Sequence, residues 1–227
     1  MNRDEDAIAV NLDPGVVDLP YEPEVDVREK VELQGVMEEY GLGPNGALVL
    51  ATDMLAAKLG EIQDEIDSFE AEHVIVDTPG QIELFAFRQS GEFMIKETKA
   101  DAKAMLFLFD PLLANTPANF LSIALLSAAV GLRMKVPKIS VLTKRDIAKE
   151  ATSTIVRWSR QAKAFEDALA ETKEAEQYSL YSSLFRSVKK LSVGEDLYPV
   201  SSTTSEGMIA LVGELSRIFS GGEEFSG

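Results

Sequence analysis

Five short apolar stretches, rich in β-branched and aromatic residues, recur along the chain, and each ends in polar residues. They cover residues 8–13, 73–78, 104–110, 138–143 and 197–202. None of them alternates cleanly between apolar and polar positions, which is typical of strands buried on both faces of a parallel sheet. The pattern therefore predicts parallel strands with helices packed on both sides of the sheet.

Helical periodicity fills several of the intervals between these strands. Apolar residues recur at helical spacing within residues 52–69, and residues 118–132 are apolar almost all round, as in a buried helix. Residues 206–219 carry one apolar stripe, with Thr203 and Glu206 at the spacing of a capping box. This alternation of strands and helices predicts a doubly wound α/β fold.

The segment from about residue 147 to residue 191 departs from this alternation. It is charged and free of strand patterns, and its aromatic residues are scattered among helix formers. We predict a helical insertion packed on a single domain of residues 1–227, which ends in a frayed tail at about 221–227. Its core, rather than a base-stacking platform, is expected to contain Phe165, Tyr178, Tyr181 and Phe185.

Composition and charge restrict the classes of function. The chain has 38 acidic and 22 basic residues and a net charge of −16, which argues against a general nucleic-acid or anionic-membrane binder. The lack of cysteine and the single histidine exclude a disulfide framework, a thiol nucleophile and a multi-histidine metal site. The charged start is no signal peptide, and no apolar run is judged long enough to span a membrane. We expect a soluble, cytoplasmic protein.

Ligands of open parallel sheets bind beyond the carboxyl ends of the strands, so the polar residues there are the candidate site. The second stretch continues as DTPGQIE. In phosphoryl-transfer proteins an aspartate at such a position holds Mg²⁺, which suggests this role for Asp77. Gly80 would then donate its N–H to the γ-phosphate, Gln81 would orient a water and Glu83 would support it. The alternative is a tight turn in which Asp77 caps a helix.

The fourth stretch ends in Thr143-Lys144-Arg145-Asp146, the pattern of guanine recognition. The Asp146 carboxylate can accept hydrogen bonds from both N1–H and N2–H of guanine, a donor pair that adenine lacks. The Lys144 stem can lie along the base. The alternative is a solvated surface loop, but the order of this motif after DTPGQ favours the nucleotide.

Two further strand ends and one connection add candidates. Ser201, Ser202 and Thr203 could place backbone amides near guanine O6, or simply cap a helix. Asp13, in NLDPG, could face the γ-phosphate or the attacking water beside Gln81, although Asp-Pro-Gly is also strong turn chemistry. The glycine-rich stretch at residues 43–46 is predicted to be a turn between two helices.

Six segments in this order closely resemble the GPN-loop GTPases over residues 8–219: NLDPG, LPYEPEVDVRE, GPNGALV, DTPGQIELF, TKRD and SSTTSEG. The short chain looks most like the archaeal members. The resemblance implies a homodimeric P-loop GTPase that uses Mg²⁺. It also implies that Gly43, Pro44 and Asn45 of one subunit reach the γ-phosphate side of the partner's nucleotide, with Asn45 as a catalytic residue in trans.

The chain also departs from the family pattern. Members of the family have a strand, a phosphate-binding loop and a helix before the strand that ends in NLD, whereas no Gly-Lys-Ser or Gly-Lys-Thr occurs in these 227 residues. We therefore expect the first strand, the P-loop and the first helix to be missing here, which would expose two sheet edges. A misassigned start, a fragment and a paralogue that has lost hydrolysis all remain open.

These observations lead to one main functional hypothesis and two alternatives. The main hypothesis is a GTP-binding protein that hydrolyses GTP to GDP and phosphate as a dimeric switch or assembly factor. The first alternative is a non-catalytic scaffold or dimerisation partner, because the phosphate-binding loop is absent. The second is an ATPase of the related dimeric class, which TKRD argues against. Nothing in the sequence identifies a client complex.

Overall fold

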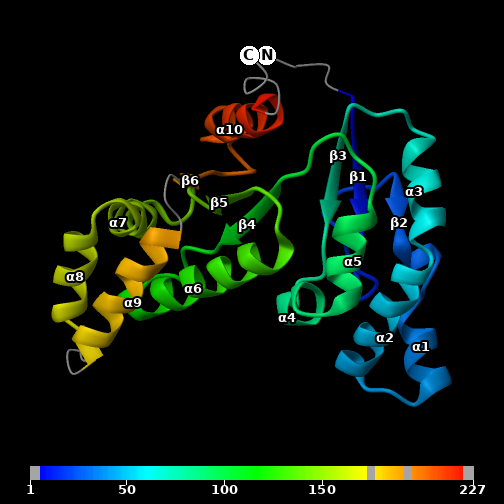
Figure 1. The fold of residues 1–227 in the computed structure, drawn as a ribbon, viewed down its shortest axis with the longest axis horizontal. Helices are drawn as coiled ribbons and strands as arrows, with labels where there is room; N and C mark the ends of the chain where they lie inside the picture. Colours follow the sequence, from blue (N-terminus) through cyan, green and yellow to red (C-terminus); the bar gives the residue numbers. More distant parts are fainter. Residues whose placement is uncertain (1–5, 173–176, 192–195, 222–227) are drawn as a thin grey trace. The chain divides into compact units, whose positions relative to one another are not determined.

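The computed structural model describes residues 6–172, 177–191 and 196–221. The chain forms two compact units, residues 1–100 and 101–227, and each is described by itself. Both are built from parallel strands and helices, as the pattern predicts (Figure 1). The predicted single domain stays a prediction, and the predicted tail lies outside the described residues except for Gly221.

The first unit contains a three-stranded parallel sheet in the order β2-β1-β3. Its core includes Val10, Val25, Leu55 and Ile62, all nearly fully buried. The two-residue strand β2 has no counterpart in the sequence prediction because it is too short to show a periodicity. The elements are β1 (Ala7–Asn11), β2 (Val25–Asp26), η1 (Val27–Glu29), α1 (Leu33–Tyr40), α2 (Pro44–Ala57), α3 (Leu59–Asp67), β3 (His73–Asp77), α4 (Ile82–Ala86) and α5 (Gln89–Glu97).

Two expectations about helix α2 are wrong. Residues 43–46 do not form a separate turn, because Gly43 is the N-cap in an extended conformation and Pro44 opens the helix. Proline suits this position, since its fixed φ is already helical and its missing N–H would have no partner there. The helix expected over residues 52–69 is divided into α2 and α3 at Lys58, where ψ is 11°. Gly60, a poor helix former, follows the break.

The second unit contains the parallel sheet β4-β5-β6. Residues Ile139, Val141, Val200 and Leu211 form one buried cluster between this sheet and the last helix. The elements are β4 (Met105–Phe109), α6 (Pro117–Met134), β5 (Lys138–Leu142), α7 (Lys149–Arg160), α8 (Ala162–Ala170), α9 (Tyr178–Leu191), β6 (Leu197–Pro199) and α10 (Met208–Ser220).

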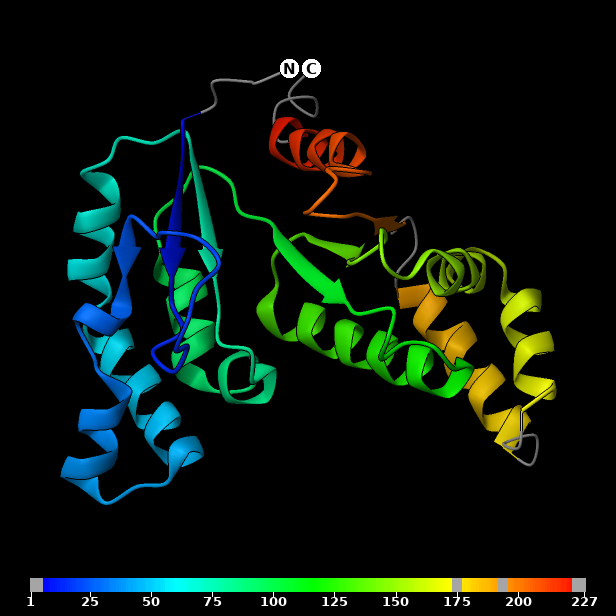
Figure 2. The same cartoon turned by 180° about the vertical axis from the view of Figure 1, so that it is seen from behind.

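The region predicted as an insertion is helical wherever it is described, and α9 packs alongside α6 (Figure 2). Phe165 and Phe185 stack with ring centroids 4.1 Å apart, and Phe120 of α6 packs against both. Trp158 is also buried in this aromatic cluster. Tyr178, expected in the core, is exposed because it lies at the start of α9.

Helices α6 and α10 correct two further expectations. By length and composition alone α6 could cross a membrane, a test that a core helix of a globular protein also passes. The capping box predicted for α10 does not form, because Gly207 occupies the N-cap position with φ +81°. A side chain there would collide with the Pro199 carbonyl, so the position requires glycine. Glu206 pairs with Arg145 instead.

Strands β3 and β4 each lie at an edge of their own sheet. All five residues of β3 are exposed, including Ile75 at 65%. In β4, Leu106 and Leu108 are exposed although the strand is apolar. Side chains of this kind are typical of strands that are covered on both faces, so these two edges are the least protected parts of the sheets.

Candidate functional site

The carboxyl end of the first sheet brings Asp13 and Asp77 to the same edge. Strands β1 and β3 run parallel with Asn11 opposite Asp77, and the N–H of Leu12 donates to the Asp77 carbonyl at 2.8 Å. Asp13 is the next residue. Parallel strands end together, so two acidic residues that are distant in the sequence lie at one site.

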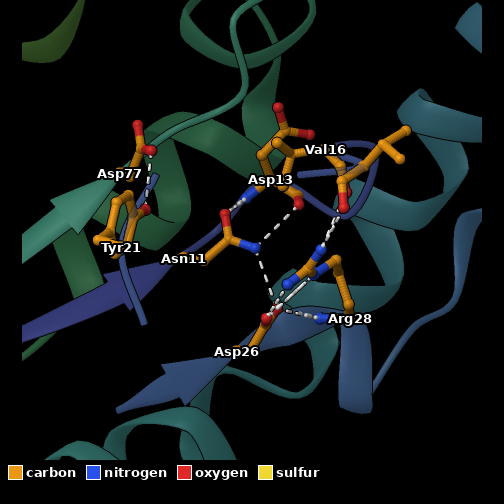
Figure 3. A network of polar contacts seen from close by, with 8 residues as sticks. Asn11, Asp13, Val16, Tyr21, Asp26, Arg28 and Asp77 are labelled. Atoms are coloured by element: carbon orange, nitrogen blue, oxygen red, sulfur yellow. Dashed lines mark hydrogen bonds and ion pairs between the residues drawn. The ribbon is translucent and has the colours of Figure 1, made fainter. Parts of the chain in front are cut away.

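The turn that carries Asp13 is held by the side chain of Asn11 (Figure 3). Asn11 is fully buried; its Oδ1 accepts the N–H of Asp13 at 3.0 Å and its Nδ2 donates to the Asp13 carbonyl at 3.2 Å. Asp13 Oδ1 in turn accepts the N–H of Gly15 at 2.8 Å. Among the described residues Asp13 Oδ2 has no such partner, so this oxygen is available to a ligand.

Asp77 is exposed and is contacted by a tyrosine from the loop between β1 and β2. The hydroxyl of Tyr21 donates to Asp77 Oδ2 at 2.8 Å (Figure 3). Partial burial raises the pKa of Tyr21, and the hydrogen bond to the Asp77 carboxylate raises it further, so the hydroxyl stays protonated and remains a donor. The contact fixes one carboxylate oxygen of Asp77 and leaves the other open.

The donor set at Asp77 fits Mg²⁺ of the kind that nucleotides carry. The described residues hold no group of three or more acidic or histidine side chains around one point. Mg²⁺ in phosphoryl-transfer sites commonly takes one or two carboxylates and completes its shell with phosphates and waters. A single exposed carboxylate at a strand end matches that pattern, whereas an all-protein metal cage is not found in the described part of the chain.

Gly80, Gln81 and Glu83 follow Asp77 across a short connection. Gly80 and Gln81 are exposed, Gln81 is the N-cap of α4, and Glu83 lies in the first turn of that helix. The side chains of Gln81 and Glu83 make no hydrogen bond to Asp13 or Asp77 in the described residues. Their assignment to water positioning therefore stays a prediction that rests on their place in the chain.

Asn45 lies in the first turn of α2, next to Pro44 and Gly43, and all three residues are exposed. Within the described residues its side-chain amide makes no hydrogen bond. Asn45 is therefore presented to solvent at the start of a rigid helix, where its amide can both donate and accept.

The second sheet brings together the two segments predicted to bind guanine. Thr143 donates to the Phe109 carbonyl through its N–H at 2.9 Å and its Oγ1 at 3.1 Å, which fixes the start of the TKRD loop at the end of β4. The N–H of Arg145 donates to the Val200 carbonyl at 3.1 Å, and Arg145 pairs with Glu206 at 3.3 Å. The loop after β5 therefore lies beside the loop after β6.

Lys144 adopts a left-handed backbone conformation with φ 56°, which is uncommon for a residue with a side chain. Its Nζ lies 2.8 Å from Asp110 Oδ2 at the end of β4, and Asp110 Oδ1 accepts the N–H of Leu112. Burial alone would raise the pKa of Asp110, but the bonds from Lys144 and Leu112 outweigh it, so the pKa of this carboxyl lies below its usual value.

The serine-rich turn after β6 is only partly free to bind a ligand. Ser201 is fully buried, its N–H donates to the Glu206 carbonyl at 2.9 Å, and its Oγ accepts the N–H of Thr204 at 3.1 Å. Ser202 and Thr203 are exposed, and in the described residues their amides have no such partners. These two amides, rather than that of Ser201, are available to donate to a ligand, and their role at guanine O6 stays a prediction.

The candidate residues are thus grouped into two halves, one in each unit. Asp13, Asp77, Gly80, Gln81, Glu83 and Asn45 belong to the first, and Thr143, Lys144, Asp146 and the turn at 201–203 belong to the second. Asp146 is half-buried. The expectation that Asp77 and Asp146 face one crevice stays a prediction.

Four residues beside these sites received no role of their own from the sequence, although the first three lie within LPYEPEVDVRE: Tyr21, Asp26, Arg28 and Asp110. Asp110 ends a predicted strand, so the rule that directs attention to strand ends would have included it. Asp26 and Arg28 stand two residues apart, and this spacing suits an aspartate that accepts from the second N–H that follows it. Tyr21 carries no such signal, because its partner is 56 residues away.

The chain is similar to known proteins at the levels of family, sequence and structure. Residues 1–220 match a family described as "Conserved hypothetical ATP binding protein". GPN-loop GTPase 1 of Saccharomyces cerevisiae is 28% identical over 212 residues, which cover 87% of this chain and 54% of the relative. A GPN-loop GTPase of Pyrococcus abyssi is 36% identical over 160 residues, covering 70% of this chain and 61% of the relative.

The structural comparison covers nearly all of the chain. The crystal structure of a GTPase from Pyrococcus abyssi in its apo form superposes with a TM-score of 0.82 at 27% identity, covering 95% of this chain and 87% of that one. The predicted fold, that of P-loop GTPases with a helical insertion, is therefore confirmed. The chain spans about half the length of the curated relatives that it matches.

Proposed function

Because this chain belongs to the family of GPN-loop GTPases, we propose that it binds GTP with Mg²⁺ and hydrolyses it to GDP and phosphate. It acts as a homodimeric switch or assembly factor in the cytoplasm. The relatives are GTPases by name, and each unit carries a group of polar residues at its strand ends that suits one part of such a nucleotide.

The observation that carries the proposal is the contact between the TKRD loop and the turn after β6. The Arg145 N–H to Val200 carbonyl bond and the Arg145–Glu206 pair place the Asp146 loop beside the free amides of Ser202 and Thr203. One segment offers a carboxylate for guanine N1–H and N2–H, and the other offers N–H groups for O6. Adenine has an acceptor at N1 and a donor at N6, where guanine has a donor at N1 and an acceptor at O6. This arrangement therefore favours guanine over adenine.

The first half of the site would act on the phosphates. Asp77 would hold Mg²⁺, which supplies charge neutralisation when bound, and Gly80 would donate its N–H to the γ-phosphate. Asp13, through its open oxygen, and Gln81 would orient the attacking water, Glu83 would support them, and Asn45 of the partner subunit would complete the site. Hydrolysis of this type depends on positioning and on fixed charges.

Nucleotide competition against a bound fluorescent GDP analogue tests the proposal. GTP and GDP should displace the analogue and ATP should not, and the Asp146→Asn variant should prefer xanthine nucleotides, because an amide N–H₂ can donate to the xanthine O2. A chain that binds ATP as well as GTP would favour the ATPase alternative; the description of the matching family names ATP binding.

The scaffold alternative rests on a specific observation, the lack of Gly-Lys-Ser or Gly-Lys-Thr in the 227 residues. That motif supplies a lysine, a hydroxyl and several backbone donors to the phosphates, and each charge-assisted bond contributes roughly 1.5–3 kcal/mol. The same competition assay separates the readings. A dimeric chain that binds no guanine nucleotide at millimolar concentration would support the scaffold and overturn the GTPase proposal.

A further inference from the structure

The loop between β1 and β2, residues 12–24, carries Asp13 but leaves Val17 exposed at 82%. Leu12 and Pro14 are buried, but residues 15–18 bury little apolar surface and need polar contacts to hold one conformation. Arg28, in η1, supplies them: its Nη1 donates to the Val16 carbonyl at 3.2 Å (Figure 3). It also donates to the Val17 carbonyl at 3.1 Å. These carbonyls lie three and four residues after Asp13.

The other edge of the Arg28 guanidinium is bound to Asp26. Nη2 lies 2.6 Å and Nε 2.9 Å from Asp26 Oδ2, and the backbone N–H of Arg28 donates to Oδ1 at 3.0 Å. The Asp26 side chain is only 13% exposed. Burial alone would raise the pKa of Asp26, but its bonds from Arg28 and Asn11 hold that pKa below its usual value, so it remains a charged acceptor near neutral pH.

Asp26 also joins this pair to the opposite end of the turn. Its Oδ1 accepts from Asn11 Nδ2 at 3.0 Å, and Asn11 holds the backbone of Asp13 through both its amide atoms. Arg28 therefore reaches the Asp13 turn by two routes, directly at the Val16 and Val17 carbonyls and indirectly through Asp26 and Asn11. Hydrogen bonds therefore hold the backbone of the turn on both sides of Pro14 and Gly15.

We propose that Arg28 is a positioning residue, which holds the Asp13 turn in one conformation before any nucleotide binds. The inference rests on the proposed function for the role of Asp13, and on geometry alone for the grip on the turn. A guanidinium is required because its planar fork bonds a carboxylate on one edge and two carbonyls on the other, whereas an ammonium is a point charge that cannot keep this geometry. A turn fixed in advance avoids ordering when the site assembles.

The Arg28→Lys variant tests the proposal, with Arg186→Lys as the matched control. Arg186 also forms a forked pair with a carboxylate, that of Glu166, but it lies on α9 and its guanidinium contacts no loop carbonyl among the described residues. In the nucleotide-free full chain, a peptide that contains Asp13 and Gly15, whose N–H groups are hydrogen-bonded within the turn, should exchange roughly tenfold faster in Arg28→Lys and unchanged in Arg186→Lys. Unchanged exchange of this peptide in Arg28→Lys would overturn the proposal.

Steady-state GTP hydrolysis gives the second readout. Arg28→Lys should lower kcat on the order of 10- to 100-fold while KM changes little, because misplacing a water-orienting group affects the chemical step. A rise in KM with kcat unchanged would contradict a positioning role. If the wild-type chain hydrolyses no GTP, the proposed function fails, but the exchange comparison still decides whether Arg28 holds the turn.

A second variant distinguishes a local loss of the Arg28 contacts from general misfolding. Asp26→Asn keeps the size of the side chain and the Oδ1 acceptor for Asn11, but it removes the charge that anchors Arg28. It should raise exchange in the same peptide, by less than Arg28→Lys does, while the melting temperature stays close to that of the wild type. Faster exchange spread evenly over the whole first unit, in both variants, would mean a general loss of stability and would overturn the proposal.

Discussion

Two candidate catalytic elements of the first unit are held in very different ways. Asp13 lies in a turn whose backbone and side chain are bonded to Asn11 and Gly15, and Arg28 grips the residues that follow. Asn45 lies at the start of α2, exposed, with no side-chain hydrogen bond in the described residues. Only the backbone of Asn45 is positioned, by Pro44 and the helix.

The difference indicates where each element finds its binding partners. A side chain whose surroundings are complete within the chain is ready to act there, as Asp13 is. An exposed amide on a rigid helix terminus has its donor and acceptor groups free for another molecule, which fits the hypothesis that Asn45 acts on the nucleotide of a second subunit. If the Asp13 turn and the start of α2 respond alike to substitution, this difference between them does not exist.

The largest expected effect is on hydrolysis in Asn45→Ala. If Asn45 contacts the transferring phosphate or the water, kcat should fall on the order of 10²–10³-fold, the range found when one fixed polar group is removed from a charged transition state. GTP affinity and melting temperature should stay near wild-type values, because the side chain makes no bond within the described part of its own chain. Gln34→Ala, an exposed amide on neighbouring α1, is the control.

Mixing two inactive variants shows whether Asn45 acts in trans. A heterodimer of Asn45→Ala and Asp13→Asn subunits contains one site with both native residues if Asn45 crosses the interface, and none if it acts within its own subunit. Recovery of activity on mixing supports the trans arrangement. A dimeric Asn45→Ala protein that binds GTP and hydrolyses it at the wild-type rate would contradict any catalytic role.

The sequence predicts these two elements unequally, for physical reasons. Asp13 and Asp77 are predictable because parallel strands end at one edge, and their register brings them together. The start of α2 was misjudged because Gly-Pro-Asn-Gly favours a turn locally, while the same proline also suits the first position of a helix. Local chemistry allowed both outcomes, and the buried apolar residues Ala47 and Leu48 favour the helix.

The contacts that support the site were the least predictable. The bonds from Tyr21 to Asp77 and from Lys144 to Asp110 join residues 56 and 34 positions apart. Periodicity reports which face of an element is apolar, but it carries no information on which polar side chains meet across a loop. The pairs emerge only once the strand order and register are known.

The next largest effect is on stability, in Asn11→Ala. Asn11 is fully buried and bonds Asp13 and Asp26, so its removal leaves the partly buried N–H and carbonyl of Asp13 without this partner and takes one bond from Asp26. We expect a loss of about 2–3 kcal/mol in the free energy of unfolding. Denaturant titration measures it, and Asn119→Ala, an exposed asparagine on α6, should stay within about 0.5 kcal/mol of the wild type.

Asn11→Ala separates the two elements because it removes hydrogen bonds from the Asp13 turn and leaves the start of α2 with Asn45 unchanged. Equal stabilities for Asn11→Ala and the wild type would show that the Asp13 turn is held by something other than its side-chain bonds. A loss in Asn45→Ala as large as that in Asn11→Ala would show that the start of α2 is no freer than the turn, and the distinction between the two elements would fail.

The smallest effect extends the comparison to the second unit, where Asp110 anchors Lys144. Asp110→Asn should reduce stability at pH 7 by less than about 1 kcal/mol, because Lys144 is 50% exposed and solvent screens the pair. The pKa of Asp110 is lowered in the folded chain, so its contribution is present above the ordinary aspartate pKa and is lost as the pH falls through the lowered value. The stability curves of variant and wild type should therefore converge below about pH 4.

Thermal melting from pH 7 to pH 3 measures this, with Asp53→Asn, from the exposed Arg88–Asp53 pair, as control. A difference that grows as the pH falls would mean that the Asp110 carboxylate is held by something other than the Lys144 bond and the Leu112 N–H.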